Sequence, residues 1–254
     1  AVLLFIYAPI LLLVVYSFTD SNVIGKWDGF SFDPYVQLFR DAEIMQILFN
    51  TIWLALAAAL LSTVLGTAGA IGIFYSKRKF AKPLQAVSQI PVINAEIVTA
   101  ISLALLFSAV FLYRTYLSLI VGHMVLCTPF VVLSVMPKLK QMDPNIYEAA
   151  LDLGASPSAA LFKVVIPQIF SGIVSGFMLS ITLSLDDYIV TAFTKPPMFD
   201  TISTYVYNAV KNGTNSSTPA LRALSALIFI VMIAVLLAIN LRARRPAAKK
   251  EAAQ

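Results

Sequence analysis

Long apolar stretches separated by short polar segments are the main pattern along the chain. A helix that crosses the hydrocarbon core of a bilayer needs roughly 20 mostly apolar residues. Stretches that meet or approach this length lie at 1–18, within 44–76, within 83–113, at 115–136, at 164–185 and at 223–241. They lack the short polar and apolar alternation that is typical of a membrane β-barrel. The pattern therefore predicts an all-α membrane protein with about six transmembrane helices.

The positions of Lys and Arg predict the orientation of these helices. If the first helix runs outward, the inside segments 75–90, 137–163 and 242–250 carry 12 of the 18 basic residues. Cytoplasmic loops of membrane proteins are enriched in Lys and Arg. Both termini are therefore expected in the cytoplasm.

Composition agrees with a membrane protein. Of the 254 residues, 59% are hydrophobic and 12% are charged, whereas soluble domains have about 45–50% apolar and about 25% charged residues. The net charge of +5 follows from the basic inside segments, so it is no sign of nucleic-acid binding. With Cys127 as the single cysteine, a disulfide within the chain is excluded.

The beginning of the sequence suggests that residues precede it. The chain opens at Ala1, without an initiator Met, directly in an apolar stretch. We expect further cytoplasmic residues before Ala1. A cleaved signal peptide is the alternative, but the stretch has no basic leader and no evident small-residue cleavage site.

The longest inside segment has the local signals of two short helices. Asp143 can cap a helix that begins at Pro144, Gly154 can end it in a left-handed conformation, and Ser156 with Pro157 can start the next helix. The first of these helices has an apolar stripe at helical spacing. Its members are Ile146, Ala149, Ala150 and Leu153. A stripe on a loop needs a partner, and the pattern leaves open whether that is this chain or another subunit.

The same segment resembles the EAA loop of binding-protein-dependent ABC importer permeases. It has Glu148-Ala149-Ala150, then Gly154 four residues later and Ile166-Pro167 twelve residues further on. The resemblance covers nearly the whole chain and is greatest to the PotC-like permease subunits of spermidine/putrescine importers. Further segments that carry it are Trp27–Phe30, Asn50-Thr51, Thr128–Val132, Thr182–Asp187, Thr201–Ser203 and Tyr205–Lys211.

The resemblance implies a type I ABC importer permease fold in the bacterial inner membrane. Residues 1–254 then form a single transmembrane permease domain with a cytoplasmic EAA coupling helix in the loop 143–167 and a mobile cytoplasmic tail at about 243–254. In this family the coupling helix sits in a cleft of the ATP-binding subunit. The resemblance also implies a second, PotB-like permease subunit, two PotA-like ATP-binding subunits and an external PotD-like substrate-binding protein. The residues expected to couple to the ATPase are Glu148, Ala149, Ala150, Asp152 and Gly154.

The chain has no motif for binding ATP or a metal ion. No G-x-x-x-x-G-K-[ST] sequence occurs in the 254 residues, so ATP and Mg²⁺ are expected only on partner ATPase subunits. The chain is therefore not expected to be an enzyme or to bind a cofactor. His123, the only histidine, has no Cys or carboxylate at ligand spacing. We expect it to be packed or hydrogen-bonded, and no metal site is predicted.

Carboxylates near the predicted helices suggest a path for a cation. Ionisable residues at membrane depth usually face the interior of a bundle or an aqueous path. Asp186 and Asp187 are expected toward the outer end of that path, and Glu96 with Asn94 deeper. Adjacent helical residues point about 100° apart, so one of the two aspartates is expected to face the path. Tyr188 can offer an aromatic face to an amine, as can Tyr205 and Tyr207, although aromatic residues also gather at membrane interfaces.

Carboxylates at two depths suit a polyamine, because each ammonium group can exchange water for a negative partner. Other interpretations remain open at this point. The aspartate pair can be a solvated helix end, and Glu96 can pair with the partner subunit. The cargo can be another small solute, such as an anion, a sugar or an amino acid. A secondary transporter that needs no ATPase is a different class of protein.

Three glycines in the second predicted helix favour close packing of helices. Gly66, Gly69 and Gly72 lie three residues apart, and small residues let helix backbones approach one another in a membrane. No strand precedes them, so G-x-x-G-x-x-G is not a dinucleotide-binding loop here.

Overall fold

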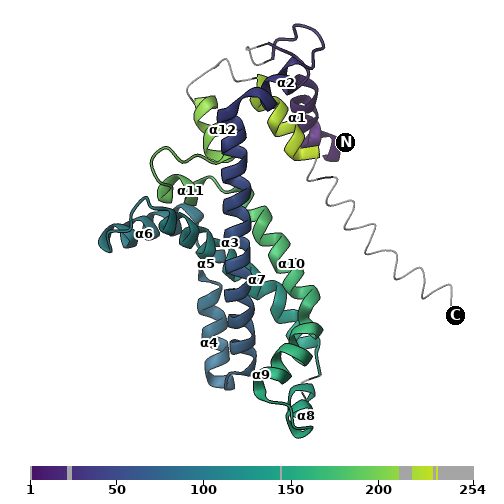
Figure 1. The fold of residues 1–254 in the computed structure, drawn as a ribbon, viewed down its shortest axis with the longest axis vertical. Helices are drawn as coiled ribbons and strands as arrows, with labels where there is room; N and C mark the ends of the chain where they lie inside the picture. The colour runs from purple at the N-terminus through teal and green to yellow at the C-terminus, as the bar shows by residue number, and fades with distance from the viewer. Residues whose placement is uncertain (1, 22–24, 144, 212–218, 231–232, 234–254) are drawn as a thin grey trace, which may run out of the picture. The chain divides into compact units, whose positions relative to one another are not determined.

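The computed structural model describes residues 2–21, 25–143, 145–211, 219–230 and 233. Helices connected by turns and short linkers make up these ranges, which contain no strand (Figure 1). In chain order they are α1 (Val2–Tyr16), α2 (Asp33–Arg40), α3 (Ala42–Tyr75), α4 (Arg78–Ser88), α5 (Ile90–Ile93), α6 (Glu96–Ala109), α7 (Tyr116–Gln141), α8 (Ile146–Asp152), α9 (Pro157–Ala160), the π-helix Leu161–Val165, α10 (Ile166–Asp186), α11 (Ile189–Thr194) and α12 (Ile202–Lys211), followed by the helix Pro219–Ile230. The predicted all-α fold class is confirmed.

The chain divides into two compact units. Residues 47–205 form the central unit, and residues 1–46 together with 206–254 form the terminal unit. In the described part of the chain, three helical stretches are long and apolar enough to cross a membrane: α3, α7 and the continuous stretch Pro157–Asp186. They correspond to the second, fourth and fifth predicted spans.

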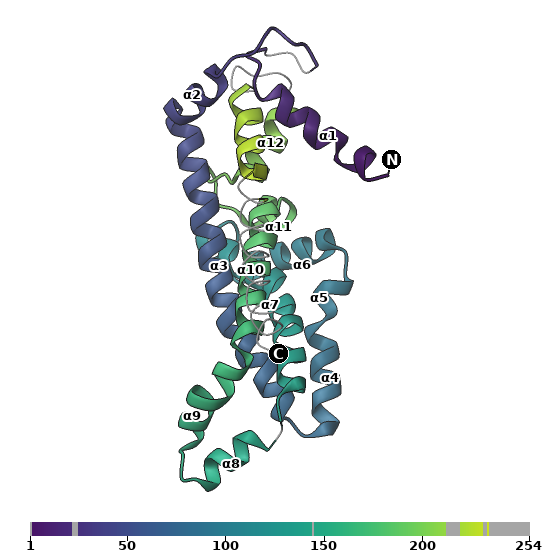
Figure 2. The same ribbon diagram turned by 90° about the vertical axis from the view of Figure 1, so that its right-hand side faces the viewer.

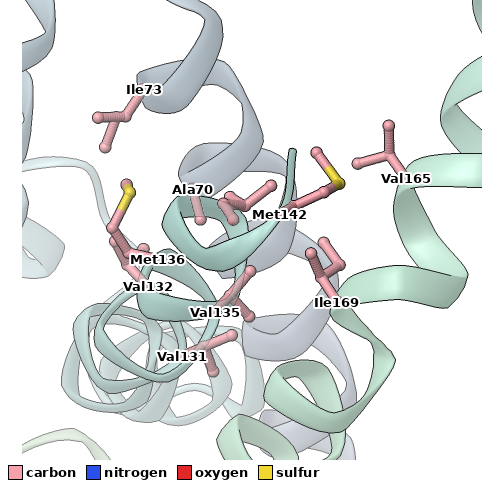
Figure 3. Packing of buried hydrophobic residues seen from close by; sticks show 10 residues of the cluster. Ala70, Ile73, Val131, Val132, Val135, Met136, Met142, Val165 and Ile169 are labelled. Atoms are coloured by element: carbon pink, nitrogen blue, oxygen red, sulfur yellow. The ribbon is translucent and has the colours of Figure 1, made fainter. Parts of the chain in front are cut away.

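An apolar core joins these three stretches in the central unit. Val131 and Val135 of α7 pack in one cluster with Ala70 of α3 and Ile169 of α10 (Figure 3). All four side chains are fully buried. Lipid tails are as apolar as leucine, so helices associate in a membrane through close van der Waals packing rather than through the hydrophobic effect.

Glycines allow this packing, but only one of the three predicted positions lies at a close contact. A Cβ atom on Gly66 would lie 2.6 Å from Cβ of Val131 on α7, which leaves no room for a side chain. A Cβ on Gly69 would lie 4.0 Å from Val132, and a Cβ on Gly72 would meet nothing within 4 Å. Each step of three residues changes the direction by about 60° around the helix, so Gly72 points about 120° away from Gly66.

The third predicted span is broken. Lys79–Ile93 and Glu96–Ala109 together have the composition of a membrane span, but they meet at an angle of 104°. The break falls at Asn94 and Ala95, whose ψ angles of 147° and 130° are extended rather than helical. The Asn94 amide donates to the Thr99 hydroxyl at 3.1 Å, and such side-chain hydrogen bonds compete with helical backbone conformation. The third predicted span is therefore interrupted rather than one continuous helix.

The terminal unit holds the two remaining apolar segments. α1 has 15 residues, and Pro219–Ile230 is also a short apolar helix. Arg222 of this second helix donates a hydrogen bond to the backbone carbonyl of Ser21. Most of the sixth predicted span beyond residue 230, and the predicted mobile tail at 243–254, lie outside the described residues.

Candidate functional site

Two helix breaks in the central unit face a common pocket of about 550 Å³. One break separates α5 from α6, and the other separates α10 from α11. The lining residues are Pro91, Val92, Asn94, Glu96, Thr99, Leu126, Phe130, Thr182, Leu183, Asp186, Asp187, Tyr188, Ile189 and Val190. Discontinuous helices commonly form the substrate sites of transporters, because their free ends present unpaired backbone groups.

All five residues proposed for the substrate path line this one pocket. They are Asn94, Glu96, Asp186, Asp187 and Tyr188. The sequence placed Glu96 deeper than the aspartates, whereas the structure brings the three carboxyl groups together. The reason is the sharp bend before α6, which a straight third span would not have. Tyr205 and Tyr207 are not among the lining residues.

The pocket is electrically suited to a cation. Three of its lining residues carry a carboxyl group, and none of them is Lys, Arg or His. The C-terminal end of α10 also lies at the pocket, because α10 ends at Asp186. Its partial negative charge is opposed by the positive N-terminal ends of α6 and α11, which begin at the lining residues Glu96 and Ile189. The carboxylates therefore determine the sign of the pocket.

The two adjacent aspartates lie in different surroundings. Asp186 is exposed, and its carboxylate has no hydrogen bond or ion pair with a residue in the described ranges. The Asp187 side chain is fully shielded from solvent. It accepts hydrogen bonds from the backbone N–H groups of Val190 at 3.2 Å and Thr191 at 2.8 Å. Asp187 therefore satisfies free donors at the start of α11, while Asp186 is open to the pocket.

His123 of α7 is buried and hydrogen-bonded, as predicted. Its Nδ1 lies 2.8 Å from the Ser184 hydroxyl of α10, and its Nε2 lies 3.0 Å from the Thr191 hydroxyl of α11. The same Nε2 is 3.5 Å from Oδ2 of Asp187. Asp187 follows His123 by 64 residues, so spacing along the chain gave no signal of this contact. No carboxylate lies at ligand spacing from His123 in the sequence, and the fold brings the distant Asp187 beside it.

The second candidate site is the loop that resembles the EAA coupling loop. α8 begins at Ile146, and Pro144, the predicted first residue of the helix, lies outside the described residues. Oδ1 of Asp143 accepts from the Asn145 N–H at 2.9 Å. Gly154 has a φ of +86°, as predicted. Its N–H donates to the carbonyl of Leu151, and the next N–H donates to the carbonyl of Ala150. This pair of bonds is a Schellman motif, which ends α8 sharply.

The element after this turn differs from the predicted second short helix. The Ser156 hydroxyl accepts from the Ala159 N–H at 3.3 Å and Pro157 occupies the first turn, so the predicted start is confirmed. α9 does not end as a separate helix, however. It continues through the π-helix Leu161–Val165 into α10, in one stretch of 30 residues. Pro167 has no N–H to donate and lies inside this stretch. It follows the π-helix closely, at the point where the regular α-helical hydrogen bonding is already interrupted.

The apolar stripe of α8 is divided between two environments. Ile146 and its neighbour Tyr147 pack against the apolar core of the central unit, and the ring of Tyr147 lies 5.1 Å from that of Tyr75 on α3. Leu153 is 90% exposed. The expected ATPase-coupling residues Glu148, Ala149, Asp152 and Gly154 are exposed, and Ala150 is half-buried. α8 is thus anchored on one side and offers the other to solvent.

The two candidate sites lie at opposite ends of α10. In both ribbon views α8 and α9 lie at the end of the central unit away from α11 (Figures 1 and 2). α10 has 21 residues, so at 1.5 Å per residue it separates the coupling loop from the pocket by about 30 Å. A rigid helix of this length can transmit a displacement from one site to the other.

Comparison with known proteins assigns the chain to a family. Residues 62–245 match the sequence profile of the binding-protein-dependent transport system inner membrane components. The chain belongs to this family. As a permease subunit of an ABC importer it is not an enzyme, since ATPase activity lies in separate subunits. Its apolar helices are those of a multi-pass membrane protein.

Curated relatives of this permease are named for polyamine transport. The Escherichia coli putrescine transport system permease protein PotI is 34% identical over 235 residues, covering 88% of this chain and 81% of the relative. The Haemophilus influenzae spermidine/putrescine transport system permease protein PotC is 30% identical over 241 residues, covering 95% and 93%.

Solved structures show the same fold at low sequence identity. A bacterial ABC transporter involved in the import of the acidic polysaccharide alginate superposes with a TM-score of 0.72 at 14% identity, over 93% of this permease and 90% of that chain. The MetNI methionine ABC transporter gives a TM-score of 0.58 at 19% identity, over 79% and 95%. The permease therefore has the type I ABC importer fold, and the coupling loop and pocket lie within it.

Proposed function

We propose that this permease carries polyamines, such as putrescine and spermidine, across the bacterial inner membrane. The observation that carries the proposal is the pocket between the two helix breaks. Its wall has carboxyl groups from Glu96, Asp186 and Asp187 and no basic side chain. An anionic cargo would be repelled there, whereas the ammonium groups of a polyamine find negative partners. The names of the relatives support the same cargo.

The lining of the pocket also suits a linear amine. Apolar side chains, among them Leu126 and Phe130, lie beside the polar ones. The methylene segments of a polyamine can contact such a wall, while Asp186, Glu96 and the amide of Asn94 meet its nitrogen atoms. Tyr188 adds an aromatic face next to the carboxylates, where cation-π attraction favours an amine.

The exposed side of α8 is the proposed docking surface for an ATP-binding subunit. Glu148, Ala149, Ala150, Asp152 and Gly154 are the proposed coupling residues, with Glu148 a partner for a basic residue of the ATPase. Small side chains allow close contact, and the acidic groups are open to solvent. Nucleotide-driven movement of α8 would be carried along α10 toward the pocket.

The complete transporter would contain a second, PotB-like permease, two PotA-like ATP-binding subunits and a PotD-like external binding protein. ATP and Mg²⁺ would be bound only by the ATP-binding subunits, and this chain would hold no cofactor. The excess of basic residues in the segments around α4 and α8 and in the tail supports an orientation with both termini in the cytoplasm.

Neutral variants of the pocket test the cargo. We expect Asp186→Asn and Glu96→Gln each to raise the KM for spermidine uptake about tenfold or more, because a hydrogen bond to a charged group contributes about 1.5–3 kcal/mol. Uptake of labelled spermidine and putrescine is measured with the assembled transporter in proteoliposomes. Glu43→Gln is the matched control, since Glu43 is an exposed carboxylate outside the pocket.

Two outcomes distinguish an error in the proposed cargo from an error in the proposed role of the pocket. A wild-type transporter that takes up neither amine contradicts polyamine transport. If the amines are taken up and both pocket variants keep the wild-type KM, the cargo is right and the pocket is not its path.

A further inference from the structure

We infer that Asp187 is a positioning residue, held by His123, that fixes α11 in place and does not itself bind the substrate. The inference rests on the proposed function of the pocket and divides its three carboxylates into two kinds. Asp186 and Glu96 would contact the polyamine. Asp187 would shape the wall against which the polyamine lies.

The hydrogen bonds of Asp187 are the first argument. Its Oδ1 accepts from the Val190 N–H at 3.2 Å, and its Oδ2 accepts from the Thr191 N–H at 2.8 Å and the Thr191 hydroxyl at 2.7 Å. The side chain is 0% exposed. Three of the roughly four acceptor sites of the carboxylate are therefore used by α11. Since the side chain has no exposed surface, a substrate could reach Asp187 only if the groups that cover it moved aside.

His123 completes a continuous chain of hydrogen bonds across three helices. A neutral imidazole with its proton on Nε2 donates to the Thr191 hydroxyl, which in turn donates to Oδ2 of Asp187. Nδ1 then accepts from the Ser184 hydroxyl of α10. In this arrangement the imidazole of His123 and the hydroxyl groups of Ser184 and Thr191 each have a hydrogen-bond partner. α7, α10 and α11 are therefore joined at one point, directly behind the pocket.

The position of α11 determines the shape of the pocket. Ile189 and Val190 of α11 belong to the pocket wall, and α11 packs against both α6 and α7. The fit is close, because a Cβ on Gly122 of α7 would lie 2.9 Å from Cγ1 of Val190. A shift of α11 would therefore change the pocket that Glu96 and Asp186 also line, although His123 is not itself a lining residue.

This division also explains how three carboxylates avoid trapping a polycation. Although Asp187 lines the pocket, its carboxylate accepts hydrogen bonds from the N-terminal N–H groups of α11. Hydrogen bonds and the positive end of a helix both stabilise a carboxylate. The substrate would then bind to two carboxylates, Glu96 and Asp186. Two carboxylates can recognise a polyamine, and they bind it less tightly than three, so it can be released.

The test is the KM for spermidine, normalised to the amount of assembled transporter. His123→Ala is expected to raise the KM roughly three- to tenfold, since networked residues couple by about 0.5–3 kcal/mol. His123→Gln can bridge the same hydroxyl groups and should restore a KM near wild type. Thr191→Val, which removes the linking hydroxyl at similar volume, should act like His123→Ala, and Thr191→Ser should not. If His123→Ala fails to assemble, the Thr191 pair decides alone.

Double variants separate positioning from direct contact. Asp187→Asn added to His123→Ala should raise the KM little beyond either single variant, because both break the same chain. Asp186→Asn added to His123→Ala should multiply the two effects. Multiplication in the Asp187 pair would overturn the inference by making Asp187 an independent ligand. An unchanged KM with less assembled transporter would overturn it too, by leaving His123 a merely structural role. Failure of the proposed pocket would instead appear as a wild-type KM in Asp186→Asn alone.

Discussion

Arginine in place of Ala149 is expected to reduce ATP-driven uptake more than tenfold while the permease still folds. Ala149 is exposed on α8, and the opposite side of the helix is anchored by Ile146 and Tyr147 in the core. A long charged side chain on the exposed side would keep an ATP-binding subunit from close contact. Loss of a central interface contact costs about 2–4 kcal/mol. Uptake in proteoliposomes and co-purification of the ATP-binding subunits measure the effect.

Lys140→Gln is a suitable control for this variant. Lys140 is exposed near the end of α7 and lies outside α8, so uptake and co-purification should stay near wild type. Full co-purification and wild-type uptake with arginine at position 149 would show that α8 is not the docking surface. Retained co-purification with lost uptake would place the defect in transmission along α10 rather than in docking.

Features governed by neighbouring residues were predictable from the sequence. The left-handed Gly154 and the cap at Ser156 depend on hydrogen bonds that span three to five residues. The long apolar stretches likewise predicted α3, α7 and α10, because the length and composition of a single segment decide whether it can span a membrane. Five of the fourteen lining residues, including the three carboxylates, were also among the predicted path residues, because ionisable residues at membrane depth are rare.

Features that depend on distant contacts were not predictable. Asn94 is a local signal of a helix break within 83–113, but it does not specify the 104° bend that brings Glu96 to the aspartates. The pairing of His123 with Asp187 joins residues from different helices, and the burial of Asp187 beside an exposed Asp186 follows from where α11 starts. Whether a glycine is needed depends on the facing helix, which the spacing of Gly66, Gly69 and Gly72 does not show.

A large loss of stability is expected when the closely packed glycine of α3 is replaced. Gly66→Ala is expected to destabilise the permease by about 1–3 kcal/mol, the usual cost of overpacking a core. The added Cβ would lie 2.6 Å from Cβ of Val131 and 3.0 Å from the backbone oxygen of Thr128. Val131 is fully buried and cannot move aside, so α3 and α7 must separate. Gly66→Leu should prevent a folded permease from accumulating.

Gly72 provides the matched control on the same helix. A Cβ there meets nothing within 4 Å, so Gly72→Ala should be neutral or stabilise α3 by up to about 1 kcal/mol through helix propensity. Thermal unfolding of the purified complex in detergent measures both variants under the same conditions. Equal melting temperatures for the two alanine variants would mean that α3 and α7 are not in close contact at Gly66. A loss at Gly72 alone would instead place a neighbouring subunit against that side of α3.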